Sequence, residues 1–310
     1  MLRKTIEIAT PGTRLSVAQR QLLIERPEMP KATVPIEDLG VLVIDDGRAS
    51  HTQAVFMECL AVGATVIICG RDHLPAGMML PIEGHHALTE RHWAQVEASA
   101  ALRKRLWQTL ISAKLRQQGR LLADVHGHDS GLAALAGRVR SGDPENLEAQ
   151  GAQRYWPKLF GRSFRRDRSG QDANTLLNYG YAIVRAACAR ALVASGLIPS
   201  LGVWHRNRSN PFCLADDLLE PWRPIVDWKV HRIVANVDNV PSLEHRPTRA
   251  ELLAIFNETV IVGARRWPVL LGIEQSAASL AKAIVNNDRA ALLLPESLPL
   301  QPELLDDGAA

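Results

Sequence analysis

Two separated stretches of the chain gather side chains that could hold a metal ion. The first is "NLEAQGAQRYWPKLFG", which places Glu148 on a predicted helix face that it shares, at i+3, i+4 and i+7, with Gly151, Ala152 and Tyr155. A carboxylate turned inward on such a face costs several kcal/mol without a partner, so it needs a cation or a metal. An exposed Glu148 near a helix start, stabilised by the helix dipole, explains the spacing equally well.

The second stretch, "HRNRSNPFCLADDLLEPWRPIVD", runs from residue 205 to residue 227. If "ADDLLE" is helical, Asp217 and Glu220 are spaced i, i+3 and can point the same way. Pro221 and Pro224 would then end or kink this helix and fix the carboxylates at a rigid bend. With His205 in the preceding loop, the stretch offers oxygen ligands and one imidazole. That set suits Mg²⁺ or Mn²⁺ better than a structural zinc.

A plainer interpretation of the second stretch stays open. Asp216 and Asp217 could cap a helix while Glu220 pairs with Arg223, and spacing alone slightly favours this. The basic residues that follow Glu148 shift the balance, because a basic run with interleaved aromatics beside candidate metal ligands is what a nucleic-acid phosphodiester site needs. This run consists of Arg154, Lys158, Arg162, Arg165, Arg166 and Arg168.

Individual members of this basic region have alternative roles. Arg162, Arg165 and Arg166 are candidates for contact with a nucleic-acid backbone, and an exposed helix end explains them equally well. Asn174 and Asn178, one helical turn apart, could line the same cleft, although hydrogen bonding between helices is favoured. The histidines in the loop before residue 87 are interpreted as surface or hinge residues rather than ligands; they are His73, His85 and His86.

Bulk composition places the chain among ordinary globular proteins. It has 310 residues, is 46% hydrophobic and 22% charged, and carries a net charge of +3, so a large core and two domains are expected. Residues 101–120 and 151–170 are basic, whereas residues 295–310 are acidic. The four cysteines form no CxxC pair, which favours a reduced cytoplasm. The first residues lack the apolar run of a signal peptide, and no apolar stretch reaches about 18 residues, so neither a signal peptide nor a membrane span is expected.

The sequence predicts an α+β fold, with a small β-rich N-terminal domain (1–75), a linker (76–89), a larger all-α domain (90–296) and a loose acidic tail (297–310). A strand–helix–strand pattern is formed by segments 41–44, 52–63 and 64–69. No glycine-rich phosphate-binding loop follows the first strand. Asp45 and Asp46 at that strand end suggest a polar turn more than a phosphoacceptor. Residues 71–86 are expected to form a loop. Helical patterns cover 90–123, 143–160, 172–195, 214–220, 224–238, 249–262 and 273–288.

Several strings together resemble one known family. They are "LGVLVIDD", "GRDHLPAGMMLPIEGHH", "NLEAQGAQRYWPKLFG", "DANTLLNYGYAIVRAACARALVASGLIPSLGV" and "HRNRSNPFCLADDLLEPWRPIVD". In this order they resemble the CRISPR-associated adaptation nuclease–integrases, the Cas-one family, and most closely the forms from type II systems. The resemblance implies a β-rich domain that dimerises and a helical domain that carries the active site.

The resemblance also implies a reaction and a set of ligands. A divalent metal, Mg²⁺ or Mn²⁺, would be held by Glu148, His205 and Glu220, with Asp217 as a possible helper. The 3′-hydroxyl of a short DNA duplex would attack a phosphodiester of a CRISPR repeat, a transesterification. Glu220 stands where some branches have Asp, which leaves the metal preference open.

The implied partners are double-stranded DNA (prespacer and repeat), a second copy of this chain, a small Cas-two protein that bridges two dimers, and other type II CRISPR proteins, in the cytoplasm of a prokaryote. The residues expected to contact DNA are Arg154, Lys158, Arg162, Arg165, Arg166 and Asn178. Two alternatives are a DNA-binding scaffold without catalysis and a metal phosphohydrolase acting on small phosphorylated molecules.

Overall fold

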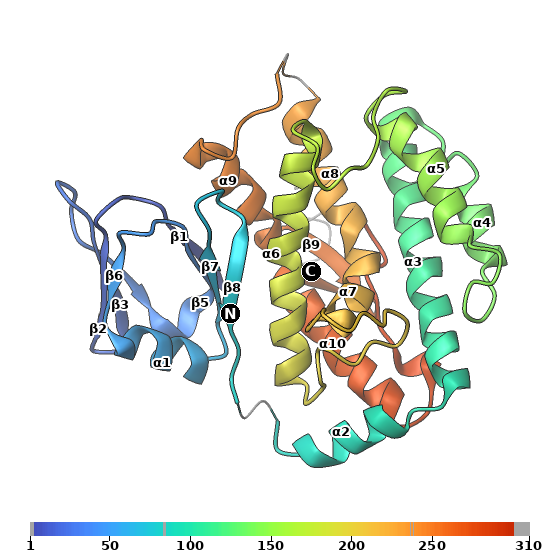
Figure 1. The fold of residues 1–310 in the computed structure, drawn as a ribbon, viewed down its shortest axis with the longest axis horizontal. Coiled ribbons are helices and arrows are strands. Elements are labelled where there is room, and N and C mark those ends of the chain that lie inside the picture. The colour runs from blue at the N-terminus through green and yellow to red at the C-terminus, as the bar shows by residue number, and fades with distance from the viewer. Residues whose placement is uncertain (1–2, 83–84, 236, 238, 301–310) are drawn as a thin grey trace, which may run out of the picture.

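The computed structural model describes residues 3–82, 85–235, 237 and 239–300. Strands dominate the N-terminal part and helices dominate the rest, so the α+β prediction is confirmed (Figure 1). Within the described residues, no helix is both long and apolar enough to cross a membrane.

Among the described residues, two four-stranded sheets, one α-helix and the short 3₁₀ helix η1 (Ile36–Asp38) form the N-terminal part. The first sheet has the order β1-β5-β7-β8, and the second has the order β4-β3-β2-β6. The first sheet contains β1 (Lys4–Ile8), β5 (Leu39–Ile44), β7 (Thr65–Cys69) and β8 (Pro75–Met79). The second contains β2 (Arg14–Ala18), β3 (Gln21–Glu25), β4 (Ala32–Pro35) and β6 (Ser50–His51). Helix α1 (Gln53–Ala61) connects β5 to the parallel strand β7, as the sequence predicted.

Strand β5 is the centre of the N-terminal part and is buried along its whole length. Leu42 and Ile44 pack with the second sheet and α1. Val41 and Val43 belong instead to the core of the helical part. The apolar run of β5 is therefore continuous because both of its faces are covered, as is usual for a buried parallel strand.

The loop predicted at 71–86, and with it the linker at 76–89, is partly wrong. Pro75–Met79 forms β8, which pairs antiparallel with β7, so the sheet continues beyond residue 75. The proline and glycine of this segment suggested a loop. However, a strand that begins at the sheet edge tolerates a proline, because its missing N–H would not join the ladder.

Helices make up most of the remaining chain. They are α2 (Leu88–Glu97), α3 (Ala100–His126), α4 (Leu132–Arg138), α5 (Leu147–Leu159), α6 (Ala173–Ala194), α7 (Cys213–Leu219), α8 (Arg223–Val234), α9 (Arg246–Leu253) and α10 (Val269–Val285). Short 3₁₀ turns are η1 (Ile36–Asp38), η2 (Glu220–Trp222), η3 (Ala254–Asn257) and η4 (Arg289–Ala291). Helix α6 packs against β7 and β8 on one side and against α7, α8 and α10 on others (Figure 1).

Two helical predictions need correction. The stretch 90–123 is two helices, since Ser99 adopts an extended conformation and its side chain accepts a hydrogen bond from Leu102 N, which starts α3. The predicted helix 249–262 ends early, and its β-branched run becomes β9 (Thr259–Val262), paired with β10 (Arg265–Pro268). Gly263 and Ala264 both have positive φ, the geometry of a two-residue hairpin turn.

The loose tail predicted at 297–310 is also partly wrong. Residues 295–300 lie antiparallel to β9, where Glu296 N donates to Ile261 O and Leu300 N donates to Thr259 O. Residues 301–310 lie outside the described part of the chain.

The N-terminal sheet is joined to α9 by buried charges. Arg249 Nε lies 2.7 Å from Glu7 Oε1 and 2.8 Å from Asp45 Oδ2. His73 Nδ1 lies 2.8 Å from the same Asp45 oxygen. Asp45 is therefore a paired strand-end carboxylate, and His73 is a partner of that carboxylate.

Gly151 allows α5 to approach α3 closely, because a Cβ at this position would lie 2.2 Å from Leu115 Cδ2. We predict that Gly151→Ala lowers the free energy of unfolding by about 1–3 kcal/mol through overpacking. Gly137→Ala, on the exposed face of α4 with open space around it, should be neutral or stabilising by up to about 1 kcal/mol. Urea unfolding would measure both, and equal stability of the two variants would contradict the close packing.

Candidate active site

Lys114 is the point at which the two separated acidic stretches meet. Its Nζ lies 2.6 Å from Glu148 Oε1 and 2.5 Å from Glu220 Oε2. Helix α3 supplies the lysine, α5 the first carboxylate and η2 the second. The two glutamates therefore converge on a single positively charged atom.

Glu148 is positioned by the start of α5. Asn146, in a left-handed conformation, accepts a hydrogen bond from Ala149 N, and the two carboxylate oxygens of Asp143 accept from Leu147 N and Glu148 N. The first turn is thereby fixed, and the Glu148 side chain is 29% exposed. Both interpretations of its spacing hold in part: it lies at a helix start, and it has a cationic partner.

Glu220 is almost completely buried and has two cationic partners. In addition to Lys114, Arg223 Nε donates to Glu220 Oε1 at 2.9 Å, which is the pairing suggested by the plainer interpretation. Burial opposes ionisation of this carboxyl group, but Arg223 and Lys114 outweigh it and lower the pKa of Glu220 to about 2. The two carboxylates in turn raise the pKa of the Lys114 ammonium against the effect of its own burial. The Glu220 carboxylate and the Lys114 ammonium are therefore both charged near neutral pH.

Asp217 contacts both the backbone and the ring Nδ1 of His205. Its fully buried carboxylate accepts hydrogen bonds from Trp204 N, from His205 N and, at 2.6 Å, from His205 Nδ1. The other ring nitrogen, Nε2, has no hydrogen-bond partner among the described residues, an arrangement typical of histidines that bind metals. The hydrogen bond to Asp217 raises the pKa of His205; burial opposes this shift, and the charges of Asp217 and Glu220 add to it.

The capping role proposed for the two aspartates is wrong. No side chain caps the start of α7. Asp216 instead pairs with Arg185 Nε at 2.5 Å and accepts from Asn210 Nδ2 at 2.6 Å. Asp227, to which the sequence assigned no catalytic role, is buried and accepts hydrogen bonds from Tyr155 and Tyr181.

The fold brings two of the three predicted metal ligands, Glu148 and Glu220, to one position. Among the described residues, no group of three or more His, Cys, Asp or Glu side chains is arranged to hold a metal ion. Glu148 and Glu220 do share one cation position, occupied by the Lys114 ammonium. His205 lies near enough to Glu220 for that carboxylate to raise its pKa. Two carboxylates and an imidazole are a donor set that suits Mg²⁺ or Mn²⁺.

A cleft of about 690 Å³ opens beside His205. Five of the described residues that line it are arginines, namely Arg166, Arg168, Arg185, Arg206 and Arg223. Asp216 is the one carboxylate in this lining, and Arg185 already neutralises it. The cleft therefore presents excess positive charge, which suits a phosphate backbone.

The predicted DNA-contacting residues separate into two groups. Arg166 and Asn178 line the cleft, and Arg166 donates to Asn174 Oδ1 and Asn178 Oδ1. The two asparagines therefore bind the loop that precedes α6. The prediction that they form hydrogen bonds between helices is wrong. The other predicted residues are absent from the lining of this cleft: Arg154, Lys158, Arg162 and Arg165.

The sequence interpretation missed Lys114, Arg185 and Arg206. A signal for Lys114 was present, because it lies four residues after Leu110 on the apolar stripe of its helix, where an unpaired lysine would be costly. Arg185 likewise follows Tyr181 by one helical turn. The partners of Lys114 and Arg185 depend on how the helices pack, so the sequence alone does not identify them.

The His205–Asp217 contact predicts a pH effect. In metal-free buffer, Asp217→Asn should lower the pKa of the His205 imidazole, because the charge and hydrogen bond that favour the imidazolium are lost. Asp216→Asn, at the neighbouring position that pairs with Arg185, is the matched control and should shift it less. The Hε1 chemical shift of His205 followed against pH would measure both midpoints. An unchanged midpoint in Asp217→Asn would contradict the positioning role.

The family model and the curated relatives that match this chain agree on one family. The family model described as CRISPR associated protein Cas1 matches residues 6–242. A protein named CRISPR-associated endonuclease Cas1, from Neisseria meningitidis serogroup C, is 34% identical over 297 residues, covering 94% of this chain and 95% of the relative.

Solved structures share the fold. A casposase bound to integration product aligns with a TM-score of 0.75 at 20% identity, over 95% of this chain and 92% of that chain. A chain of a Cas6-RT-Cas1–Cas2 complex aligns with a TM-score of 0.68 at 15% identity, over 97% of this chain and 36% of that chain. Since the family model spans most of the sequence and the Neisseria relative aligns over nearly all of it, this chain belongs to the Cas1 family of CRISPR associated proteins.

Proposed function

We propose that the chain is a metal-dependent DNA integrase of CRISPR adaptation. It would join the 3′-hydroxyl ends of a short DNA duplex to phosphodiesters of a CRISPR repeat by transesterification, in the cytoplasm of a prokaryote. The observation that carries this proposal is the convergence of Glu148 and Glu220 on one cation position, beside His205 and an arginine-lined cleft.

Glu148, Glu220 and His205 would hold the metal ion, which when bound supplies Lewis-acid charge for the attacking hydroxyl and the leaving oxygen. The other residues prepare this position. Lys114 and Arg223 keep the Glu220 carboxylate ionised, and Asp217 orients His205. Arg166, Arg185 and Arg206 would hold phosphates without reading base sequence.

The named relatives support the class of reaction and the partners. The Neisseria relative is named an endonuclease, and the casposase was solved with an integration product. The Cas6-RT-Cas1–Cas2 complex supports a Cas2 protein as partner. Assembly as a homodimer through the β-rich part, two dimers bridged by Cas2, and contact with other type II CRISPR proteins complete the proposal.

A joining assay tests the site. We predict that Glu148→Ala, His205→Ala and Glu220→Ala each reduce joining by about 10- to 100-fold or more, because each removes a metal ligand. The assay contains Cas2, a short duplex with free 3′-hydroxyl ends, a plasmid carrying the repeat, and Mn²⁺ or Mg²⁺. Glu145→Ala removes an exposed acid that pairs with Arg138 and Arg140 and should leave joining unchanged.

The outcomes of this assay separate the candidate functions. Normal joining by any of the three ligand variants would overturn the site assignment. DNA binding without joining by the unmutated protein, with either metal, would favour the scaffold. If no joining occurs, and a parallel incubation with small phosphorylated molecules in place of DNA releases phosphate, the phosphohydrolase would be favoured.

The arginine-lined cleft predicts a salt effect. Duplex affinity should fall steeply between about 50 and 200 mM salt, and Arg206→Ala should reduce the slope of log K against log salt by about one, since one phosphate contact is lost. Arg48→Ala, at an exposed position of the N-terminal part, is the matched control. Fluorescence anisotropy of a labelled duplex measures the slopes, and equal slopes for the two variants would exclude Arg206 from the phosphate contacts.

A further inference from the structure

Two tryptophans form a stack beside His205. The indole rings of Trp107 and Trp204 are nearly parallel, with 5° between their planes and 5.3 Å between their centroids. The His205 imidazole lies almost perpendicular to the Trp107 ring, at 88° and with centroids 5.5 Å apart. Stacked and edge-to-face arrangements are the favoured geometries of aromatic pairs. Trp107 therefore contacts the rings of both Trp204 and His205.

Trp107 is a fixed support for this cluster. It belongs to α3 and is only 2% exposed. Lys114 follows it by seven residues, so the two side chains lie on one face of the helix, two turns apart. The stack therefore rests on the face of α3 that also carries the cation shared by Glu148 and Glu220.

The backbone on both sides of the Trp204 side chain is fixed as well. The amides of Trp204 and His205 both donate to the carboxylate of Asp217. Gly202 permits this tight turn, because a Cβ there would lie 2.4 Å from His205 O and 2.8 Å from Asp217 Oδ2. With the backbone held, the stack on Trp107 fixes the remaining freedom of the Trp204 side chain.

Trp204 also reaches the loop that precedes α5. A Cβ at Gly142 would lie 3.5 Å from Trp204 Cζ3, so the glycine and the indole are direct neighbours. The next residue, Asp143, accepts the amide hydrogen bonds of Leu147 and Glu148 that fix the first turn of α5. The Trp204 ring therefore lies between α3 and the loop that positions Glu148.

The hydrogen bond to Asp217 does not by itself fix the imidazole of His205. It holds one ring atom, Nδ1, and the ring can still tilt about that contact. A neighbouring ring removes this freedom. Metal ligands need such support, because a working site requires its side chains to be held within about 0.5 Å.

From these contacts we infer that Trp204 is a positioning residue for His205. Packed between Trp107 and Gly142, its indole ring sets the place of the His205 imidazole relative to the segment that carries Glu148. The effect on DNA joining rests on the proposed function, in which His205 and Glu148 are both metal ligands. The effect on the imidazole itself does not depend on that function.

Trp204→Ala in the full chain tests this inference with two readouts. At saturating duplex, the rate of joining should fall by about 10- to 100-fold, the usual loss when a residue that orients a metal ligand is removed. The duplex concentration that gives half the maximal rate should not change. In metal-free buffer, at a pH where the imidazole is neutral, the Hε1 chemical shift of His205 should move, because the ring changes its place beside Trp107. The resonance is identified by its absence in His205→Ala.

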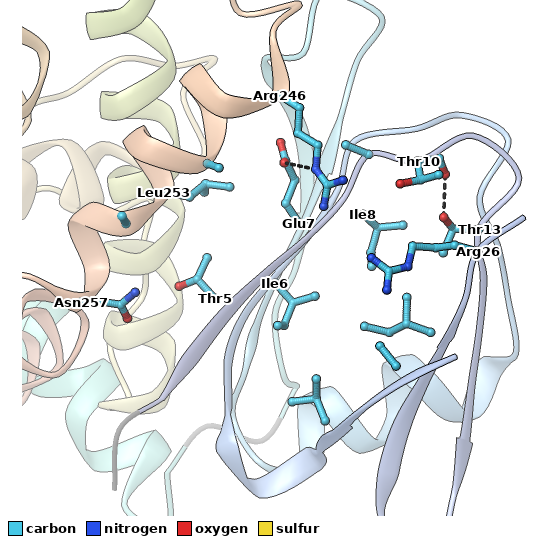
Figure 2. A pocket seen from close by; sticks show the side chains of 16 residues that line it. Thr5, Ile6, Glu7, Ile8, Thr10, Thr13, Arg26, Arg246, Leu253 and Asn257 are labelled. Carbon is cyan, nitrogen blue, oxygen red and sulfur yellow. Dashed lines mark hydrogen bonds and ion pairs between the residues drawn. The ribbon is translucent and has the colours of Figure 1, made fainter. Parts of the chain in front are cut away.

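Two control variants separate positioning from stability. Trp204→Phe keeps an aromatic ring on Trp107 and should restore most of the rate lost in Trp204→Ala. Leu253 is 3% exposed and lines a hollow of about 390 Å³ between the N-terminal strands and α9 (Figure 2). This hollow shares none of its described lining residues with the arginine-lined cleft. Leu253→Ala removes buried apolar volume there, so it should lower the Tm but keep both the joining rate and the Hε1 shift.

Three results would overturn the inference. An unchanged Hε1 shift in Trp204→Ala means that Trp204 does not position the imidazole. Equal losses of rate in Trp204→Ala and Leu253→Ala assign the effect to stability alone. A higher half-maximal duplex concentration at an unchanged maximal rate means that the indole, which is 40% exposed, contacts DNA instead.

Failure of the proposed function gives a different result. Normal joining by His205→Ala would remove His205 from the metal site. The Hε1 shift in Trp204→Ala would still decide whether Trp204 places the imidazole, since that measurement needs neither metal nor DNA.

Discussion

Two carboxylates from distant parts of the chain must share one small buried region, and the Lys114 ammonium makes this possible. Glu148 and Glu220 would repel each other strongly away from water, because charge interactions grow as the dielectric constant falls. Lys114 lies within hydrogen-bond distance of both, and Arg223 adds a second positive charge on Glu220. Removing one member of such a network leaves a buried charge uncompensated, which costs about 3–5 kcal/mol.

The architecture around this network follows from bringing three segments together. Lys114 is 34 residues from Glu148 and 106 residues from Glu220 in sequence, so α3, α5 and η2 must pack at one place. Gly151 permits the α3–α5 approach. On the other side, Asp217 fixes the loop that presents His205. The arrangement of charged side chains beside the cleft is thus a consequence of how these elements pack.

Much of this arrangement could be predicted from the sequence. The helical spacing around Glu148 and the "ADDLLE" segment located the acidic residues, because both lie on regular helical turns. The division into strands and helices followed from hydrophobic periodicity. The strand β8 and the hairpin β9–β10 were missed, since edge strands carry prolines and glycines and a short β-branched run resembles a helix end.

The partners of the charged residues could not be predicted in the same way. Glu148 could be assigned a cation but not Lys114, because that pairing depends on how α3 and α5 pack. Asp216 and Asp217 looked alike as capping residues, yet one pairs with Arg185 and the other with His205. Spacing along a helix determines which face a side chain occupies, whereas the group opposite that face is determined by tertiary structure.

Thermal unfolding of Lys114→Met with and without Mn²⁺ tests most directly whether Glu148 and Glu220 form one cation position. The methionine keeps the length of the side chain and removes its charge, so the variant should melt at a lower temperature than the unchanged chain. Because an ion that binds only the folded state stabilises it, Mn²⁺ should raise the Tm of the variant by more than it raises that of the unchanged chain. An equally small effect of Mn²⁺ on both proteins would contradict the account.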